Sequence, residues 1–385
     1  MIPYAKQSIS EKDIEAVVQV LRSDFITQGP VVNQFETAIA QYCQAQYAIA
    51  VSSGTAALHL ACRALGIGQG DIVWTSPNTF VASANCVLYC GASIDFIDID
   101  PHTYNISIAV LKQKLETARE NDRLPAAIIP VHFAGQSCDM EAIYHLSQEY
   151  GFKIIEDAAH ALGGEYNNHR IGSCRYSDIT IFSLHPAKMI TAGEGGLLLT
   201  NSSSLAEQAV LLRTHGITRD PSLMEGESHG LWYYQQTELG YNYRITDIQA
   251  ALGLSQLQRL NEFVSRRSKI AERYNRLLSA LPLNIPQQYK SCQSSWHLYV
   301  ICLQLNKLNK NRKEIFDELR KKNIGVHVHY IPVHTQPFFK NIGFKEQDFP
   351  ESVAYYQKAI TLPIYVDLSD EIVDYIVGTL SEILV

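Results

Sequence analysis

One lysine of the sequence has surroundings that suit chemistry better than solvent exposure. Lys188 lies in SLHPAKMITAGEGG, residues 183–196, directly after the apolar run ITIF, which predicts a buried strand. The glycines that follow it allow the backbone to approach a bulky group or to take a positive φ. A partly desolvated lysine has a lowered pKa and can form a Schiff base with a carbonyl. These flanks alone leave two interpretations open, a nucleophilic lysine and an ordinary surface lysine.

Asp157 is the second candidate, at the end of the run FKIIED and before AAHALGG. A carboxylate at the carboxyl end of a buried strand points toward the crevice in which α/β proteins bind ligands. An ordinary strand-terminating or helix-capping aspartate produces the same local pattern. Together, Lys188 and Asp157 match the needs of a pyridinium-type cofactor, which takes a lysine for its aldehyde and an anion for its ring nitrogen.

A third candidate is SSGTAALHLACRAL, residues 52–65, which follows the strand-like run YAIAV. The pattern places Gly54, Thr55 and Ala56 at a helix N-terminus, where free backbone N–H groups bind phosphate. It matches neither a P-loop nor a GxGxxG fingerprint, and simple N-capping is the plainer explanation of this segment by itself. Taken together, the three candidates describe a site for pyridoxal 5′-phosphate (PLP).

These side chains need a sheet to hold them in place. Between residues 47 and 200, short apolar runs rich in isoleucine and valine alternate with helical patterns. The runs are YAIAV, IVWTS, SIDFID, AAIIPVH, FKIIED, ITIFS and GLLLT. This alternation predicts an α/β fold with a mainly parallel sheet that is covered on both faces.

The C-terminal part of the chain has a different pattern. Capping boxes at Ser10 with Asp13 and at Thr246 with Gln249 each predict a helix start, the second opening a long helix through Phe263. Beyond about residue 285, strand-like HLYVICLQL and GVHVHYI flank a helix near 311–322, and an amphipathic helix ends the chain. We predict a large PLP-binding domain over residues 1–250 and a small α+β domain over 251–385, with a ligand cleft between them.

Composition narrows the classes of function. The 385 residues carry a net charge of −7, which favours neither nucleic acid nor an anionic membrane as a partner. No apolar run reaches the roughly 18–20 residues that span a bilayer, and no signal-peptide pattern opens the chain, so we expect a cytoplasmic protein. The eight cysteines form no CxxC pair, and we expect free thiols and no metal site.

Five segments carry a resemblance to a known family, and they occur in the family's order. They are SSGTAAL, TSPNTFVASANCV, IIEDAAHALG, IFSLHPAKMITAGEGG and GYNYRITDIQAALG. With them the chain resembles the DegT/DnrJ/EryC1/StrS family of PLP-dependent sugar-nucleotide aminotransferases over essentially its whole length. The resemblance implies the fold of aspartate aminotransferase (type I PLP fold) and a homodimer with shared active sites.

The resemblance also implies roles for matching residues. Lys188 would hold the cofactor covalently and then move the reacting proton, and Asp157 would pair with the pyridine nitrogen. His160 stands where the family has a residue near the ring hydroxyl, and Phe80 matches the aromatic side chain that stacks on the ring. The cofactor phosphate would be held by Gly54, Thr55, Ala56 and Ser183, and by Asn242 of the neighbouring subunit.

The two ends of the chain resemble one branch of the family. That branch transfers the amino group of L-glutamate to C4 of UDP-2-acetamido-2,6-dideoxy-β-L-arabino-hexos-4-ulose, in pseudaminic acid biosynthesis. The product is UDP-4-amino-4,6-dideoxy-N-acetyl-β-L-altrosamine. By this resemblance the substrate pocket is lined by Tyr4, Ile26, Thr27, Gln28, His327, Val328, His329 and Tyr330. Candidate partners for the two phosphates of UDP are His329, His334 and Arg244.

Two alternatives remain open. The same chemistry can act on another nucleotide-linked keto sugar, such as a D-configured UDP-4-keto sugar or a dTDP-keto sugar. In a different class, the chain would be a catalytically inactive PLP-binding regulatory protein. Some members of the family are dehydratases with histidine in place of the lysine, and Lys188 favours transamination over that chemistry. No role is assigned to His215, Arg219 or the aromatic cluster at residues 231–236.

Overall fold

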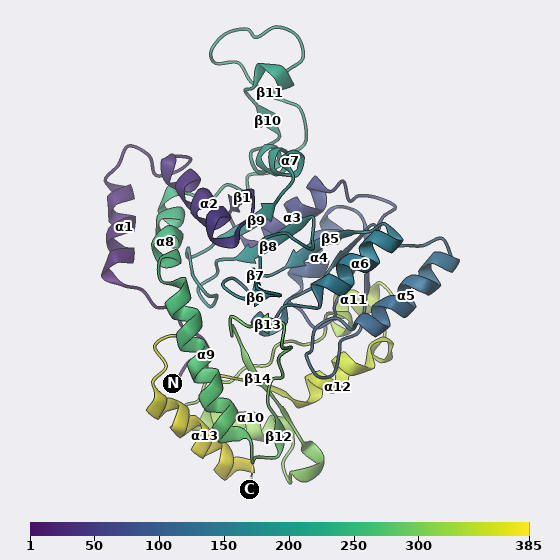
Figure 1. Cartoon of the computed structure of the whole chain (residues 1–385), viewed down its shortest axis with the longest axis vertical. Coiled ribbons are helices and arrows are strands. Elements are labelled where there is room, and N and C mark those ends of the chain that lie inside the picture. The colour runs from purple at the N-terminus through teal and green to yellow at the C-terminus, as the bar shows by residue number, and fades with distance from the viewer. Residues whose placement is uncertain (385) are drawn as a thin grey trace.

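A seven-stranded sheet forms the centre of the computed structural model, which describes residues 1–384 (Figure 1). The strand order is β1-β9-β8-β5-β4-β2-β3. The strands are β1 (Tyr47–Val51), β2 (Ile72–Thr75), β3 (Ser93–Phe96), β4 (Ala127–Ile129), β5 (Lys153–Asp157), β8 (Ile179–Ser183) and β9 (Gly196–Thr200). The strand β9 runs opposite to the other six strands of this sheet, which are parallel to one another. Each predicted apolar run forms one of these strands, and the predicted α/β fold with a mainly parallel sheet is confirmed.

Strand side chains alternate between the two faces of the sheet, and helices bury both faces. In β8, Ile179 and Ile181 pack on the face covered by α3 and α4, whereas Phe182 packs on the opposite face. Burying each such side chain stabilises the fold by about 1.5–3 kcal/mol. The helices over the two faces are α2 (Pro30–Cys43), α3 (Gly54–Ala64), α4 (Ala82–Tyr89), α5 (Ile108–Glu120), α6 (Met140–Tyr150) and α7 (Ser203–Arg213).

A smaller unit has its own sheet, in the order β12-β14-β15, and its own hydrophobic core. Its elements are α9 (Leu260–Leu278), β12 (Leu283–Asn284), β14 (Tyr299–Leu303), α10 (Arg312–Lys321), α12 (Pro350–Lys358), β15 (Ala359–Leu362) and α13 (Asp370–Leu384). The short helix α11 (Pro337–Asn341) instead packs Phe339 into the core of the large sheet. The N-terminus also lies beside this unit, because Ile2 forms a β-bridge with Ile324 (Figure 1). The domain boundary between residues 250 and 251 stays a prediction.

Two predicted elements differ in the structure. Both capping boxes are present, but the helix that Thr246 opens ends as α8 (Asp247–Leu257), and α9 begins at Leu260. At the break, the side chain of Arg259 binds the buried carboxylate of Asp13, a long-range contact with no local sequence signal. The strand-like segment 325–331 forms only an isolated bridge at His327, since the backbone N–H groups of Val328 and Tyr330 bond the side chains of His327 and Asn78 instead of a neighbouring strand.

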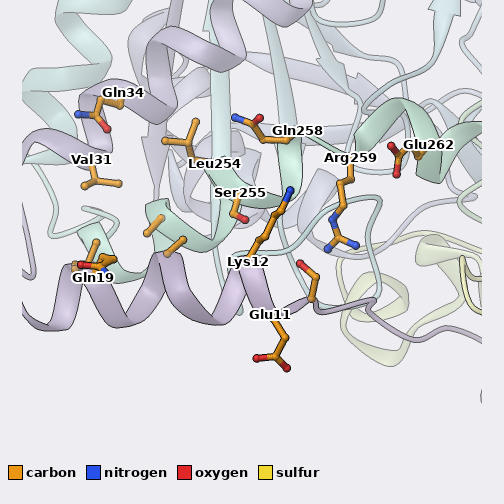
Figure 2. A pocket seen from close by; sticks show the side chains of 14 residues that line it. Glu11, Lys12, Gln19, Val31, Gln34, Leu254, Ser255, Gln258, Arg259 and Glu262 are labelled. Carbon is orange, nitrogen blue, oxygen red and sulfur yellow. The ribbon is translucent and has the colours of Figure 1, made fainter.

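Several smaller features complete the architecture. A hairpin arm of β10 (Ile217–Thr218) and β11 (Gln235–Gln236) stands out from the body at the top of Figure 1. The helix α1 (Glu11–Leu21) lies along α8, and the groove among α1, α2 and α8 has a volume of about 910 Å³ (Figure 2). A third sheet joins β13 (Cys292–Gln293), β6 (Glu165–Tyr166) and β7 (His169–Arg170). No helix within residues 1–384 has the length and apolar character to cross a membrane. All eight cysteines are free thiols.

Candidate active site

A second cavity, of about 500 Å³, lies between the large sheet and the smaller unit. The carboxyl ends of β5 and β8, the first turns of α3 and α4, and the segment 327–330 surround it. Most of the predicted site residues line this cavity and none lines the groove of Figure 2. The predicted residues in the cavity wall are Tyr4, Gly54, Thr55, Phe80, Asp157, His160, Ser183, Lys188, His327, His329 and Tyr330.

Lys188 is half-buried in the turn that follows β8, with its backbone N–H bonded to the carbonyl of His185. Burial lowers the pKa of its ammonium group to about 8, and the Asp157 carboxylate partly opposes that shift. An amine with this pKa is substantially neutral in mildly alkaline solution, whereas an exposed lysine is not. Lys188 is therefore available as a nucleophile and as a base.

This lowered pKa predicts how the cofactor-free protein captures PLP. Only the neutral amine attacks an aldehyde, so the rate of covalent capture is expected to rise with pH and to level off above a midpoint near 8. Stopped-flow absorbance at a series of pH values measures this rate. A rate that still rises steeply above pH 10 would show an unshifted lysine and contradict the prediction.

Asp157 ends β5 and is almost fully buried. Alternation along β5 places it on the face that α3 and α4 cover, with Glu156 on the opposite face. One carboxylate oxygen accepts the backbone N–H of Ala159 at 3.1 Å, and the other accepts the hydroxyl of Ser83 at 2.6 Å. Burial raises the pKa of Asp157, while these hydrogen bonds and the charge of Lys188 act in the opposite direction.

His160 is buried and neutral beside these two groups. Its Nδ1 accepts the backbone N–H of Ala134 at 3.3 Å, so the ring proton resides on Nε2, which donates to the hydroxyl of Tyr330 at 2.9 Å. Burial, and secondarily the charge of Lys188, hold the pKa of His160 well below its usual value. The ring of Tyr330 stacks on His160, and Phe80 lies 6.3 Å from Tyr330 between ring centroids.

The first turn of α3 meets the end of β8 at close range. A Cβ added to Gly54 would lie 3.0 Å from the Cβ of Ser183, and one added to Gly196 would lie 2.2 Å from the carbonyl oxygen of Ser53. Glycine at these positions lets the helix N-terminus approach a serine hydroxyl. Backbone N–H groups at a helix start, together with a hydroxyl, form a site for a phosphate group.

Other predicted residues lie outside the cavity wall. The backbone N–H of Ala56 is bonded to the Ser53 side chain, and Val328 is half-buried beside the cavity-lining histidines. Ile26, Thr27 and Gln28 are exposed in the loop between α1 and α2, and Asn242 is exposed after the hairpin arm. Of the phosphate candidates, His334 is buried among aromatic rings and Arg244 is half-buried in a bridge to β1, so neither lines this cavity.

The cavity also contains polar residues that the sequence patterns did not indicate. Thr79 and Ser83 reach it from the start of α4, Ser53 from the cap of α3, and His297 from the residues before β14. The hydrogen bond between Ser83 and Asp157 joins residues 74 positions apart. The segment TSPNTFVASAN contains both Thr79 and Ser83, and its high content of hydroxyl residues is the only local sequence feature that indicates them.

The assembled groups fit one cofactor class. A neutralisable lysine, a buried carboxylate, a neutral histidine and a glycine cradle beside a serine are the partners that PLP needs for its aldehyde, ring nitrogen, ring hydroxyl and phosphate. The fold and the site therefore define a PLP-dependent aminotransferase. The sequence matches the model of the DegT/DnrJ/EryC1/StrS aminotransferase family over residues 7–381, and the chain belongs to this family.

Individual relatives agree with that assignment. The chain is 40% identical over 385 residues to the spore coat polysaccharide biosynthesis protein SpsC of Bacillus subtilis, covering 99% of this chain and 97% of the relative. It is 35% identical to the UDP-4-amino-4,6-dideoxy-N-acetyl-β-L-altrosamine transaminase of Campylobacter jejuni, covering 100% and 98%. Among solved structures, PseC of Helicobacter pylori, an aminotransferase of pseudaminic acid biosynthesis, aligns with a TM-score of 0.91, 28% identity, and coverage of 100% and 99%. The protein is a sugar-nucleotide aminotransferase that uses an amino donor.

Proposed function

We propose that the protein transfers the amino group of L-glutamate to C4 of UDP-2-acetamido-2,6-dideoxy-β-L-arabino-hexos-4-ulose. The product is UDP-4-amino-4,6-dideoxy-N-acetyl-β-L-altrosamine, an intermediate of pseudaminic acid biosynthesis. The names of the Campylobacter transaminase and of PseC support this substrate. The observation that carries the proposal is the wall that faces Lys188, because its groups suit an uncharged N-acetyl sugar.

That wall is aromatic. The rings of Tyr4, His327 and His329 lie 4.7–5.4 Å apart between centroids, and Tyr330 continues the same surface. Burial lowers the pKa of His329 to about 3, and its Nδ1 is bonded to Thr361 Oγ1 at 2.8 Å. Aromatic rings with polar edges, among them the neutral imidazole of His329, pack against a deoxy sugar and form hydrogen bonds to its hydroxyl and acetamido groups.

PLP bound in the cavity supplies an aldehyde that accepts the amino group and a ring that takes up the electron pair of the breaking C–H bond. Lys188 would bind the aldehyde through Nζ. Once released, it would carry the reacting proton between the substrate carbon whose C–H bond breaks and the aldehyde carbon of the cofactor. Asp157 would hold a proton on the ring nitrogen, and His160, whose Nε2–H is bonded to Tyr330, would lie near the ring hydroxyl. Phe80 would cover one ring face.

Apart from Lys188, which the cofactor would engage, the same cavity has no lysine or arginine among the described residues of its lining to pair with a diphosphate. Within residues 1–384, no arginine lines it, and its charged lining groups are Asp157, Lys188 and Glu194. Phosphates require N–H donors or cations, so we infer that a second copy of the chain completes the site. We propose that Asn242 and Arg244 are the residues that the second copy contributes to this site. The exposed loop at residues 26–28 would lie near the nucleotide.

Product analysis tests the substrate. With the UDP-linked L-arabino 4-ketosugar and L-glutamate, the protein is expected to form a product in which an amino group replaces the C4 keto group. An equal amount of 2-oxoglutarate is expected to form. Mass spectrometry of the product and NMR at C4 measure the regiochemistry and the stereochemistry. D-configured UDP-4-ketosugars and dTDP-3-ketosugars, tested in parallel, are expected to turn over about 100-fold less efficiently, because one or two buried polar groups left unpaired cost about 1–3 kcal/mol.

One observation favours a second candidate, transamination of a different nucleotide-linked keto sugar. Identity to SpsC is 40%, against 35% to the Campylobacter transaminase, and SpsC serves spore coat polysaccharide synthesis. Preferential turnover of any of the comparison sugars would replace the altrosamine assignment with this candidate. The PLP chemistry would be the same.

A further inference from the structure

A chain of two buried hydroxyl groups ends on the carboxylate of Asp157. Thr79 Oγ1 lies 2.7 Å from Ser83 Oγ, which lies 2.6 Å from Asp157 Oδ2. All three side chains are at most 4% exposed. Thr79 and Ser83 are four residues apart, so the start of α4 presents both hydroxyls to the cavity face of β5.

The direction of each hydrogen bond follows from the donors available. A carboxylate only accepts, so the single proton of Ser83 is committed to Asp157, and Thr79 must donate to Ser83. Ser83 also has a local alternative, the carbonyl of Phe80 at 3.3 Å. Serine in a helix commonly takes such a bond to its own preceding turn. Here the shorter, charge-assisted bond to the carboxylate is the stronger one.

We propose that Ser83, oriented by Thr79, is a positioning residue that keeps Asp157 anionic and so sets the strength of its contact with the cofactor ring nitrogen. This inference rests on the proposed role of Asp157. Burial alone would favour the protonated carboxyl, which cannot hold a proton on a ring nitrogen. The hydrogen bonds from Ser83 and from the Ala159 backbone oppose the effect of burial on the Asp157 pKa.

Other titratable groups face the same carboxylate from neighbouring elements. Lys188 follows β8, His132 follows β4, and Tyr330 belongs to the smaller unit. The side chain of His132 is committed elsewhere, since its Nε2 bonds Glu156 at 2.8 Å and its Nδ1 accepts the Cys138 N–H. Lys188 is the group that the cofactor aldehyde would engage. Ser83 is therefore the side-chain donor that stays on Asp157 in every state of the site.

The test compares holoenzyme variants across pH. Ser83→Ala is expected to shift the acidic limb of kcat/KM upward by about one pH unit and to raise the PLP dissociation constant about tenfold or more, because a hydrogen bond to a buried anion is lost. Thr79→Val is expected to shift the same limb in the same direction by less. Ser352→Ala is the matched control, since it removes a buried hydroxyl that bonds the buried carboxylate of Asp98 at 2.7 Å, away from the cavity, and no shift is expected.

A double-mutant cycle separates this role from a purely structural one. In the Asp157→Asn background, Ser83→Ala is expected to leave the PLP dissociation constant unchanged. If Ser83→Ala weakens PLP equally in both backgrounds, or lowers kcat/KM equally at every pH, Ser83 does not act through Asp157 and the inference is wrong. If Asp157→Asn by itself leaves PLP affinity and turnover unaltered, the assignment of Asp157 fails, and the inference fails with it for a distinguishable reason.

Discussion

Replacement of Lys188 by alanine is expected to lower transaminase turnover by at least about 10²- to 10⁴-fold, the range that general acid–base catalysis contributes. Two functions are lost together, the amine that binds the cofactor aldehyde and the base that moves the proton. The pKa near 8 suits both functions at neutral pH. Turnover with the UDP-ketosugar and glutamate measures the loss, and the visible absorbance of the lysine-bound cofactor is expected to disappear.

Two further variants sharpen this test. Lys188→Arg keeps a cation at the same position but supplies no nucleophile, and it is expected to be as inactive as the alanine variant. Lys313→Ala removes a lysine that is exposed on α10, and it is expected to retain full activity. If the wild-type protein holds PLP but turns over no nucleotide sugar, and Lys188→Ala changes nothing but colour, the hypothesis of an inactive PLP-binding regulatory protein is favoured instead.

The central sheet was predictable because its strands are buried on both faces. Such strands are continuous apolar runs, and the run ITIFS forms β8 with the same first and last residues. The helix starts were predictable for a local reason as well, since a capping box such as Thr246 with Gln249 places its donors and acceptors within four residues. Neither signal depends on knowing which strands pair.

From local patterns alone, without the family resemblance, the site was predictable only where its residues end or closely follow a strand. Asp157 and Lys188 follow apolar runs, so the sequence indicates both. Ser83 and His297 carry no such mark, because their positions in the cavity depend on how α4 and the smaller unit pack. The segment 325–331 shows the opposite error, since its alternating pattern predicts a strand, whereas in the structure Tyr330 bonds His160 at the cavity and His329 bonds Thr361 of β15.

Replacement of Asp157 by asparagine is expected to reduce turnover by about 10²- to 10³-fold, the usual cost of removing one preorganised electrostatic partner. Asparagine keeps the shape and can still accept the Ala159 N–H, but it carries no charge to hold a proton on the ring nitrogen. Steady-state kinetics measure the loss. Wild-type activity in this variant would contradict the role of Asp157.

Stability distinguishes this loss from misfolding. The pKa of Asp157 is raised by burial, so in the cofactor-free protein this group favours the folded state below its unfolded-state pKa, and the contribution is lost as pH rises through the folded value. Asparagine cannot ionise, so the variant does not lose folding stability through ionisation of residue 157 as the pH rises. Urea unfolding of the cofactor-free proteins at pH 5 and pH 8 is therefore expected to show a variant at least as stable as wild type at pH 8. A variant that is inactive and also markedly less stable at pH 8 would show that Asp157 acts in the fold rather than in the chemistry.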